Sequence, residues 1–214
     1  MRRFELEHII RAASAITKQD HIVVVGSQAL LGQFPNADPR LLVSMEADVF
    51  PLQRPELSIE IDGNIGENST FHQTHGYYAH GVGEDTATLP DGWRQRLVPI
   101  HNPNTNNATG WCLDIHDLVA SKLVAGREKD MDFVAVILQK GMVQKDLLEQ
   151  RIATLPIAPR AHSLGPSQAH ASRGSRRPKT LCRRFHRVVA DNPDRGILAS
   201  PSTLAVFIPL HSLH

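Results

Sequence analysis

Two acids, Glu46 and Asp48, stand one residue apart in the apolar run LLVSMEADVF at residues 41–50. The run is bounded by the turn-rich segment QFPNADPR and by PLQRP, which predicts a strand over these residues. Because the side chains of a strand alternate between its faces, both carboxylates lie on one face and the residues beside them face a core. Like charges on one face repel each other, so a stable fold needs a reason to keep them there.

Two explanations for the acid pair remain open. A solvent-facing edge strand tolerates acids that have no function. A divalent cation, by contrast, offsets both charges, and Mg²⁺ prefers hard oxygen ligands, taking one or two carboxylates together with phosphate oxygens. The second explanation predicts that Glu46 and Asp48 hold Mg²⁺ (or Mn²⁺) beside a phosphate-containing ligand.

A second motif fits such a ligand. The run HIVVV begins at His21 and predicts a buried strand that ends at Gly26, and SQALLG is typical of the first turns of a helix with Ser27 at its N-terminus. Backbone N–H groups at the start of a helix are free to bind phosphate. Many turns between a strand and a helix use Gly-Ser, so this motif is informative only together with the acid pair.

The remaining periodicity predicts an α/β (α+β) domain over residues 1–155, with a small mixed sheet flanked by helices. LSIEIDGNIGENSTFHQTHG predicts a short helix, YYAHGV, TATLP and RLVPI predict strands, and HNPNTNNATG predicts a polar loop. The predicted longer helices cover residues 3–17, 114–125, 128–140 and 144–153.

Composition argues for a cytoplasmic protein without a membrane segment. No apolar run approaches the ~20 residues that a membrane helix needs, and the N-terminal MRRFELEHIIRAASAI has acids among its apolar residues, unlike a signal peptide. Cys112 and Cys182 lie far apart in the sequence and predict reduced thiols.

Residues 156–214 differ in character from the preceding domain. Nine of the 23 lysines and arginines lie from Arg160 onward, but only two of the 22 acids do, Asp191 and Asp194. This segment lacks a sustained period and is rich in Arg, Ser, Pro and His, which predicts a basic, poorly ordered tail. Contact with nucleic acid and a tail translated out of its ancestral frame are the alternatives.

Two charged residues fall on apolar helix faces. At about 100° per residue, Lys122 lies in the middle of the stripe formed by the 114–125 helix, and Asp130 lies inside the stripe of the next helix. Because an unpaired buried charge is costly, each needs a partner. A structural ion pair between the two helices is one explanation. The other is that both residues face the cleft of Glu46 and Asp48.

The motifs VVVGSQALL and SMEADVF resemble the nucleotidyltransferase superfamily with the polymerase-β-like fold. That superfamily has an apolar residue, Gly-Ser, a helix, and then a strand with two acids one residue apart. With the segment DLVASKLVAGREKD, the chain is similar to uncharacterised prokaryotic nucleotidyltransferase-like proteins related to abortive-infection toxins. The resemblance covers roughly residues 20–140. It implies that Gly26 and Ser27 cradle phosphates, that Lys122 and Arg127 bind the triphosphate, and that Asp130 supports Lys122 or the metal.

The resemblance further implies metal-dependent transfer of a nucleotidyl group from an NTP to a hydroxyl of RNA or protein, in a toxin-like component with an antitoxin partner. Where the superfamily has a third carboxylate, YYAHGV offers His80, and Glu60 and Asp62 follow the second strand too closely. A catalytically inactive nucleotide-binding module is therefore one alternative, and nucleic-acid binding through the tail is another. His72, His75 and His80 lack the spacing of a zinc site.

Overall fold

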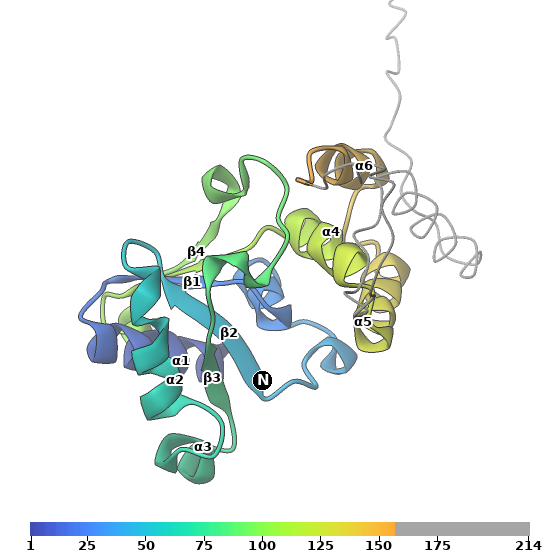
Figure 1. Cartoon of the computed structure of the whole chain (residues 1–214). Coiled ribbons are helices and arrows are strands. Elements are labelled where there is room, and N and C mark those ends of the chain that lie inside the picture. Colours follow the sequence, from blue (N-terminus) through green and yellow to red (C-terminus); the bar gives the residue numbers. More distant parts are fainter. Residues whose placement is uncertain (157–214) are drawn as a thin grey trace, which may run out of the picture.

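The computed structural model describes residues 1–156, and a five-stranded sheet lies at its centre (Figure 1). The strands are β1 (His21–Val24), β2 (Glu46–Pro51), β3 (Tyr78–Gly81), β4 (Val98–Ile100) and β5 (Thr109–Cys112), in the spatial order β3-β2-β1-β5-β4. Strand β1 pairs antiparallel with β2 and parallel with β5, while β3 runs parallel to β2 and β4 antiparallel to β5. The sheet is therefore mixed, as predicted.

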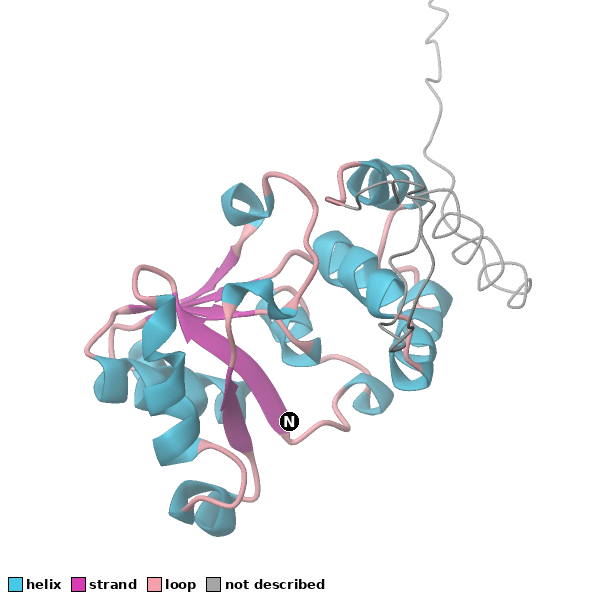
Figure 2. Cartoon of the chain, viewed as in Figure 1, coloured by secondary structure: helices cyan, strands magenta, loops and turns pink. Residues whose placement is uncertain are grey.

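The helices form two groups around the strands (Figures 1 and 2). The first group is α1 (Arg3–Thr17), α2 (Ser58–Ile65) and α3 (Thr70–His75), and the second is α4 (Ile115–Ala125), α5 (Glu128–Gln139) and α6 (Lys145–Ala153). Helices α1 and α2 pack against each other and against β2 and β3, whereas α4 packs against α5, α6 and the segment after β1. This arrangement confirms the predicted α+β class.

The burial of the central strand β1 and the packing of α1 on the sheet form the core of the domain. Strand β1 lies between β2 and β5 in the sheet, and helices cover the sheet. Its residues Ile22, Val23 and Val24 are therefore fully buried. Helix α1 buries its apolar stripe against this sheet. At Gly110 of β5 a Cβ would lie 2.3 Å from the Cδ1 of Ile10, so the glycine lets α1 approach the strand closely.

Several predicted element bounds were wrong. The strand predicted for residues 41–50 begins only at Glu46, because Pro39 and the cap formed by Asp38 place residues 39–41 in a 3₁₀ helix. SQALLG forms a 3₁₀ helix, Ser27–Gly32, rather than an α-helix. TATLP is not a strand in the structure.

The other corrections concern segments of mixed composition. LSIEIDGNIGENSTFHQTHG contains two helices, α2 and α3, because Ser69 caps a new helix by accepting a hydrogen bond from the N–H of His72. The end of the predicted polar loop forms β5, whose pairing partner β1 lies far away in the sequence. The remaining short 3₁₀ helices are Pro55–Leu57, Glu84–Thr86, Trp93–Arg96 and Pro103–Thr105.

The predicted basic tail lies outside the described residues, and its boundary with the domain stays a prediction. Among the helices within residues 1–156, none combines the length and the apolar character needed to cross a membrane.

Candidate functional site

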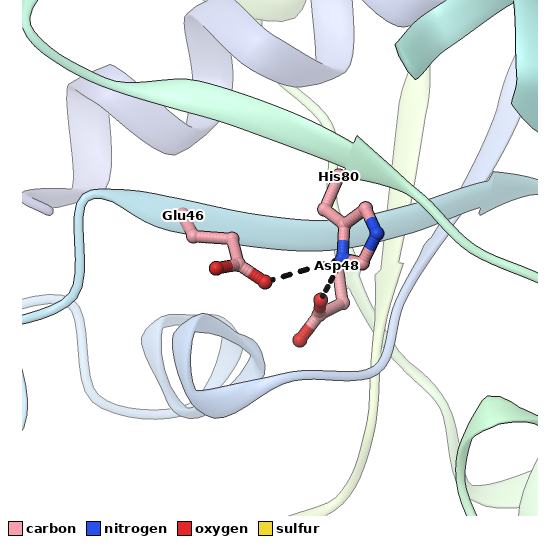
Figure 3. Close-up of side chains that lie close together, drawn as sticks. All are labelled: Glu46, Asp48 and His80. Carbon is pink, nitrogen blue, oxygen red and sulfur yellow. Dashed lines mark hydrogen bonds and ion pairs between the residues drawn. The ribbon is translucent and has the colours of Figure 1, made fainter. Parts of the chain in front are cut away.

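The acid pair and a histidine meet on one face of the sheet (Figure 3). Glu46 and Asp48 both project from the same face of β2, as strand alternation requires. In the parallel pairing of β2 with β3, His80 lies opposite Asp48. Its Nδ1 lies 3.2 Å from Oε1 of Glu46 and 3.2 Å from Oδ1 of Asp48. Ligand atoms of the three side chains all lie within 4.8 Å of one another, a spacing that could hold a metal ion.

Proximity and burial change the protonation of these groups. Burial raises the pKa of Asp48 to about 6, and the adjacent carboxyl of Glu46 adds to this shift. Burial would also raise the pKa of Glu46, but hydrogen bonds from Asp48 and Tyr78 and the charge of His80 lower it below its ordinary value. For His80 burial acts to lower the pKa, and the two carboxylates outweigh it and raise the pKa. The pair thus shares one proton at mildly acidic pH and carries two close negative charges above it.

Tyr78 completes the surroundings of Glu46. This residue lies opposite Glu46 in the pairing of β2 with β3, and its hydroxyl donates a hydrogen bond of 3.2 Å to Oε2. Because Oε1 faces His80, the two oxygens of Glu46 have different partners and the carboxylate is held in one orientation. Sequence reasoning missed Tyr78, although its two-residue spacing from His80 placed it on the same strand face.

The Gly26-Ser27 turn lies directly beside Asp48. The N–H of Val25 donates to the backbone oxygen of Asp48 at 3.0 Å, which fixes the turn to β2. A Cβ at Gly26 would lie 2.0 Å from Oδ2 of Asp48, so this position has room for glycine alone while the carboxylate stays in place. Ser27 is the first residue of the helix, as predicted, and Gly26 before it is the N-cap residue. The Ser27 hydroxyl accepts a hydrogen bond from Lys122.

Lys122 connects this turn to the second helix group. Its Nζ donates to Oγ of Ser27 at 2.8 Å and to Oδ1 of Asp130 at 3.0 Å, and lies 4.6 Å from the ring centroid of Phe133. Burial lowers the pKa of Lys122, while Asp130 acts in the opposite direction. The second oxygen of Asp130 accepts from Nε of Arg127 at 2.6 Å. Asp130 therefore pairs with two cations and positions Lys122.

All these groups line one cleft with a volume of 780 Å³ between the sheet and helices α4 and α5. The cleft contains every site residue that the sequence predicted, namely Gly26, Ser27, Glu46, Asp48, Lys122, Arg127 and Asp130, and adds His80. It also contains Arg40 and Lys129, which the sequence analysis did not single out. The geometry brings the predicted residues together, whereas their individual roles stay predictions.

Three acids from segments quoted above lie outside the cleft. Glu60 and Asp62 belong to α2 and do not line the cleft. Asp117, from the segment DLVASKLVAGREKD, is fully buried and pairs with Arg96 at 2.8 Å and with Arg151 at 3.3 Å. It joins α4 to α6 and to the segment before β4, which is a structural task.

A mixed sheet in which a strand leads through Gly-Ser into a short helix, beside an antiparallel strand with an acid-x-acid pair, defines a nucleotidyltransferase-like protein. Comparison with protein families agrees: residues 4–159 match the family described as nucleotidyltransferase of unknown function (DUF6036), and the chain belongs to this family. No curated protein and no solved structure matches it. The relation to abortive-infection toxins stays a prediction.

Proposed function

We propose that this protein transfers a nucleotidyl group from an NTP to an acceptor hydroxyl in a divalent-cation-dependent reaction. The observation that carries the proposal is the convergence of an acid pair, the Gly26-Ser27 turn and the buried Lys122 in one cleft. Membership in a nucleotidyltransferase family supports the reaction class. The acceptor would be RNA or protein, and a cytoplasmic location belongs to the proposal.

The donor set fits a divalent cation such as Mg²⁺ or Mn²⁺. Glu46 and Asp48 offer carboxylate oxygens on one strand face. Burial, and then the neighbouring Glu46, raises the pKa of Asp48 to about 6, so a cation that favours the charged form would offset both effects. A cation held there would offset the charge that develops on the α-phosphate and would favour the deprotonated acceptor hydroxyl.

The other cleft residues have separate tasks in this proposal. The phosphates would lie along the Gly26-Ser27 turn next to the Ser27 hydroxyl, while the space beside the Cα of Gly26 belongs to the Asp48 carboxylate. Lys122 would neutralise the β- and γ-phosphates, held ready by its bond to Ser27 and by Asp130. The side chain of Arg127 is 58% exposed and could reach a further phosphate oxygen.

The reaction forms one bond and breaks one. The acceptor oxygen bonds to the α-phosphorus, the bond between the α-phosphorus and the bridging oxygen breaks, and pyrophosphate leaves as the acceptor hydroxyl loses its proton to solvent. Lys122 and Arg127, which line the same cleft, would stabilise the charge on the departing pyrophosphate in this proposal.

Label transfer tests this proposal. The full chain is incubated with α-labelled NTPs, Mg²⁺ or Mn²⁺, and either RNA or total protein as acceptor. We expect label in one acceptor with the wild-type chain and none with Asp48→Asn, whose melting temperature in cation-free buffer should not fall. Label transfer by Asp48→Asn at the wild-type rate would refute the role of Asp48.

A non-catalytic nucleotide-binding module is the second candidate, and His80 is the observation that favours it. The imidazole stands where the resemblance leads us to expect a third carboxylate. If the wild-type chain binds NTPs with a divalent cation and transfers no label under any condition, the module is the better description.

We further propose that the nucleotidyl transfer serves a toxin-like role and that an antitoxin partner controls it. This role predicts growth arrest on expression of the wild-type chain but not of Asp48→Asn.

A further inference from the structure

The third side chain of the acid cluster differs chemically from the other two. His80 reaches the acids from the neighbouring strand β3, 32 residues further along the chain than Asp48. The parallel register places it opposite Asp48, so its position follows from the sheet and not from a flexible loop. The cluster therefore offers an imidazole nitrogen next to two carboxylate oxygens.

The spacing of the three ligand atoms suits a shared ion. Two ligands at right angles, each with a bond of about 2.2 Å to a metal, lie about 3.1 Å apart. The Nδ1 of His80 lies 3.2 Å from one oxygen of each acid. The remaining oxygen of Glu46 is occupied by the Tyr78 hydroxyl, which leaves Oε1 directed at the cluster. Such a hydrogen-bonded partner of a ligand carboxylate orients it towards an ion.

Within residues 1–156 no other acid of the cleft can replace the imidazole as third ligand. Asp130 already pairs with Lys122 and Arg127 through its two oxygens. Asp132 lines the cleft from α5 but does not belong to a group of three ligand side chains. Glu46, Asp48 and His80 are the one such group in the described part of the chain.

We propose that His80 is the third protein ligand of the cation site, and that the site consequently prefers a transition-series divalent ion, for which Mn²⁺ is the probe, over Mg²⁺. This inference rests on the cation site of the proposed function and deepens it. Mg²⁺ seeks an all-oxygen shell, whereas imidazole nitrogen suits transition-series ions and stabilises them increasingly along the series from manganese to copper. One imidazole nitrogen beside two carboxylates shifts the metal preference of the site towards transition-series ions. The two carboxylates remain as oxygen ligands, and nucleotide phosphates can complete the coordination shell.

The experiment measures binding and not turnover. The full chain is stripped of metal with EDTA, and Mn²⁺ is titrated while free Mn²⁺ is followed by electron paramagnetic resonance; Mg²⁺ affinity is obtained by competition. We expect Mn²⁺ to bind more than about tenfold tighter than Mg²⁺. Pulsed spectra of bound Mn²⁺ should show coupling to one ¹⁴N nucleus.

Two substitutions of His80 and one control assign that nitrogen. His80→Ala should weaken Mn²⁺ binding at least about tenfold and remove the ¹⁴N coupling. His80→Asp should also remove the coupling but strengthen Mg²⁺ binding, so that the Mn²⁺ preference falls. His101→Ala changes an exposed histidine beyond β4, at the opposite edge of the sheet, and should leave affinity and coupling unchanged. The side chain of His80 is 51% exposed, so His80→Ala should melt at a temperature close to that of the wild-type protein. His80→Asp adds a third carboxylate to the pair and should melt at a lower temperature without a cation.

The outcomes separate this inference from the proposed function. Bound Mn²⁺ without ¹⁴N coupling, or unchanged Mn²⁺ affinity in His80→Ala, overturns the role of His80 even if label transfer is observed. Absence of Mn²⁺ binding at millimolar concentration overturns it as well. Coupling that depends on His80, in a chain that transfers no nucleotide, supports the ligand assignment and counts against the enzyme.

Discussion

The carboxylate of Asp48 occupies the space in which a side chain at Gly26 would stand. A Cβ built on Gly26 would lie 2.0 Å from Oδ2 and 2.9 Å from Cγ of Asp48. The backbone of Gly26 is extended, with φ of −80° and ψ of −167°, a conformation that any residue adopts. Space for Asp48, and not backbone freedom, is therefore what requires a glycine here. The Gly-Ser turn and the acid pair form one packing unit.

Gly26→Ala should consequently damage the site more than the fold. The new methyl group forces the Asp48 carboxylate to rotate away, at an overpacking cost of about 1–3 kcal/mol in the free energy of unfolding. Mn²⁺ affinity should fall at least about tenfold as one ligand is lost. Titration calorimetry and urea denaturation check both effects.

Gly63→Ala is the matched control for this variant. Gly63 lies in α2, and nothing lies within 4 Å of a Cβ built there. Alanine should raise the free energy of unfolding by up to about 1 kcal/mol through helix propensity, with Mn²⁺ affinity unchanged. Wild-type Mn²⁺ affinity in Gly26→Ala would show that Asp48 does not depend on the space at Gly26.

Asp48→Asn should change how stability depends on pH. The pKa of Asp48 in the folded protein is about 6, above the ordinary 3.8, because of burial and the neighbouring Glu46. Between these two values the folded protein holds a proton that the unfolded chain has released, so the free energy of unfolding decreases as the pH rises through this window. Asparagine carries no charge, and its substitution should stabilise the protein by roughly 3 kcal/mol at neutral pH and by little below pH ~4.

Urea denaturation of both proteins in EDTA-containing buffer, on either side of this pH window, measures the difference. An equal effect of the substitution at both pH values would mean that the carboxyl of Asp48 does not titrate in an unusual environment.

Lys122→Met tests the buried ammonium. The methionine keeps the packing of the stem, and Asp130 keeps Arg127 as a partner at 2.6 Å. The free energy of unfolding should therefore fall by only about 1–3 kcal/mol, less than the loss expected for a stranded buried carboxylate. NTP affinity should fall by roughly 1.5–3 kcal/mol, which is about 10- to 150-fold.

Thermal melting and fluorescent-nucleotide binding on the same preparations check both numbers, with Lys18→Met at the exposed end of α1 as the control. Unchanged NTP affinity would remove Lys122 from the nucleotide site and leave it as a partner of Asp130 and Ser27.

Asp117→Ala should have the opposite profile. The carboxylate of Asp117 is buried between Arg96 and Arg151, so its loss leaves two guanidinium groups without their acid. We expect the free energy of unfolding to fall by about 3–5 kcal/mol. NTP affinity, measured well below the melting temperature, should equal that of the wild-type chain because Asp117 does not line the cleft. A weakened affinity in a folded variant would contradict this structural role.

Local patterns carried much of the fold prediction. The spacing of apolar residues placed α1 and the α4–α6 group almost to the residue, because a helix is built from contacts between neighbours in the chain. Strand alternation alone put Glu46 and Asp48 on one face. The angular position of Lys122 and Asp130 correctly predicted that both are buried on apolar faces, with exposed fractions of 8% and 1%.

Predictions failed where pairing partners are distant. Strand β5 has a polar flank and only four residues, and it becomes a strand because it aligns with β1. The strand predicted for residues 41–50 was too long. Leu41 and Val43 in its apolar first half line the cleft, and the strand begins only at Glu46.

The amino-acid sequence by itself determined which side chains carry charge on otherwise apolar faces, since alternation and helical period are local properties of the chain. Only the tertiary structure decided what those charges meet. It set His80 against Asp48 across 32 residues and Lys122 against Ser27 across 95. Contacts over such separations follow from strand register and helix packing, which depend on the burial of the whole apolar core and not on any single segment.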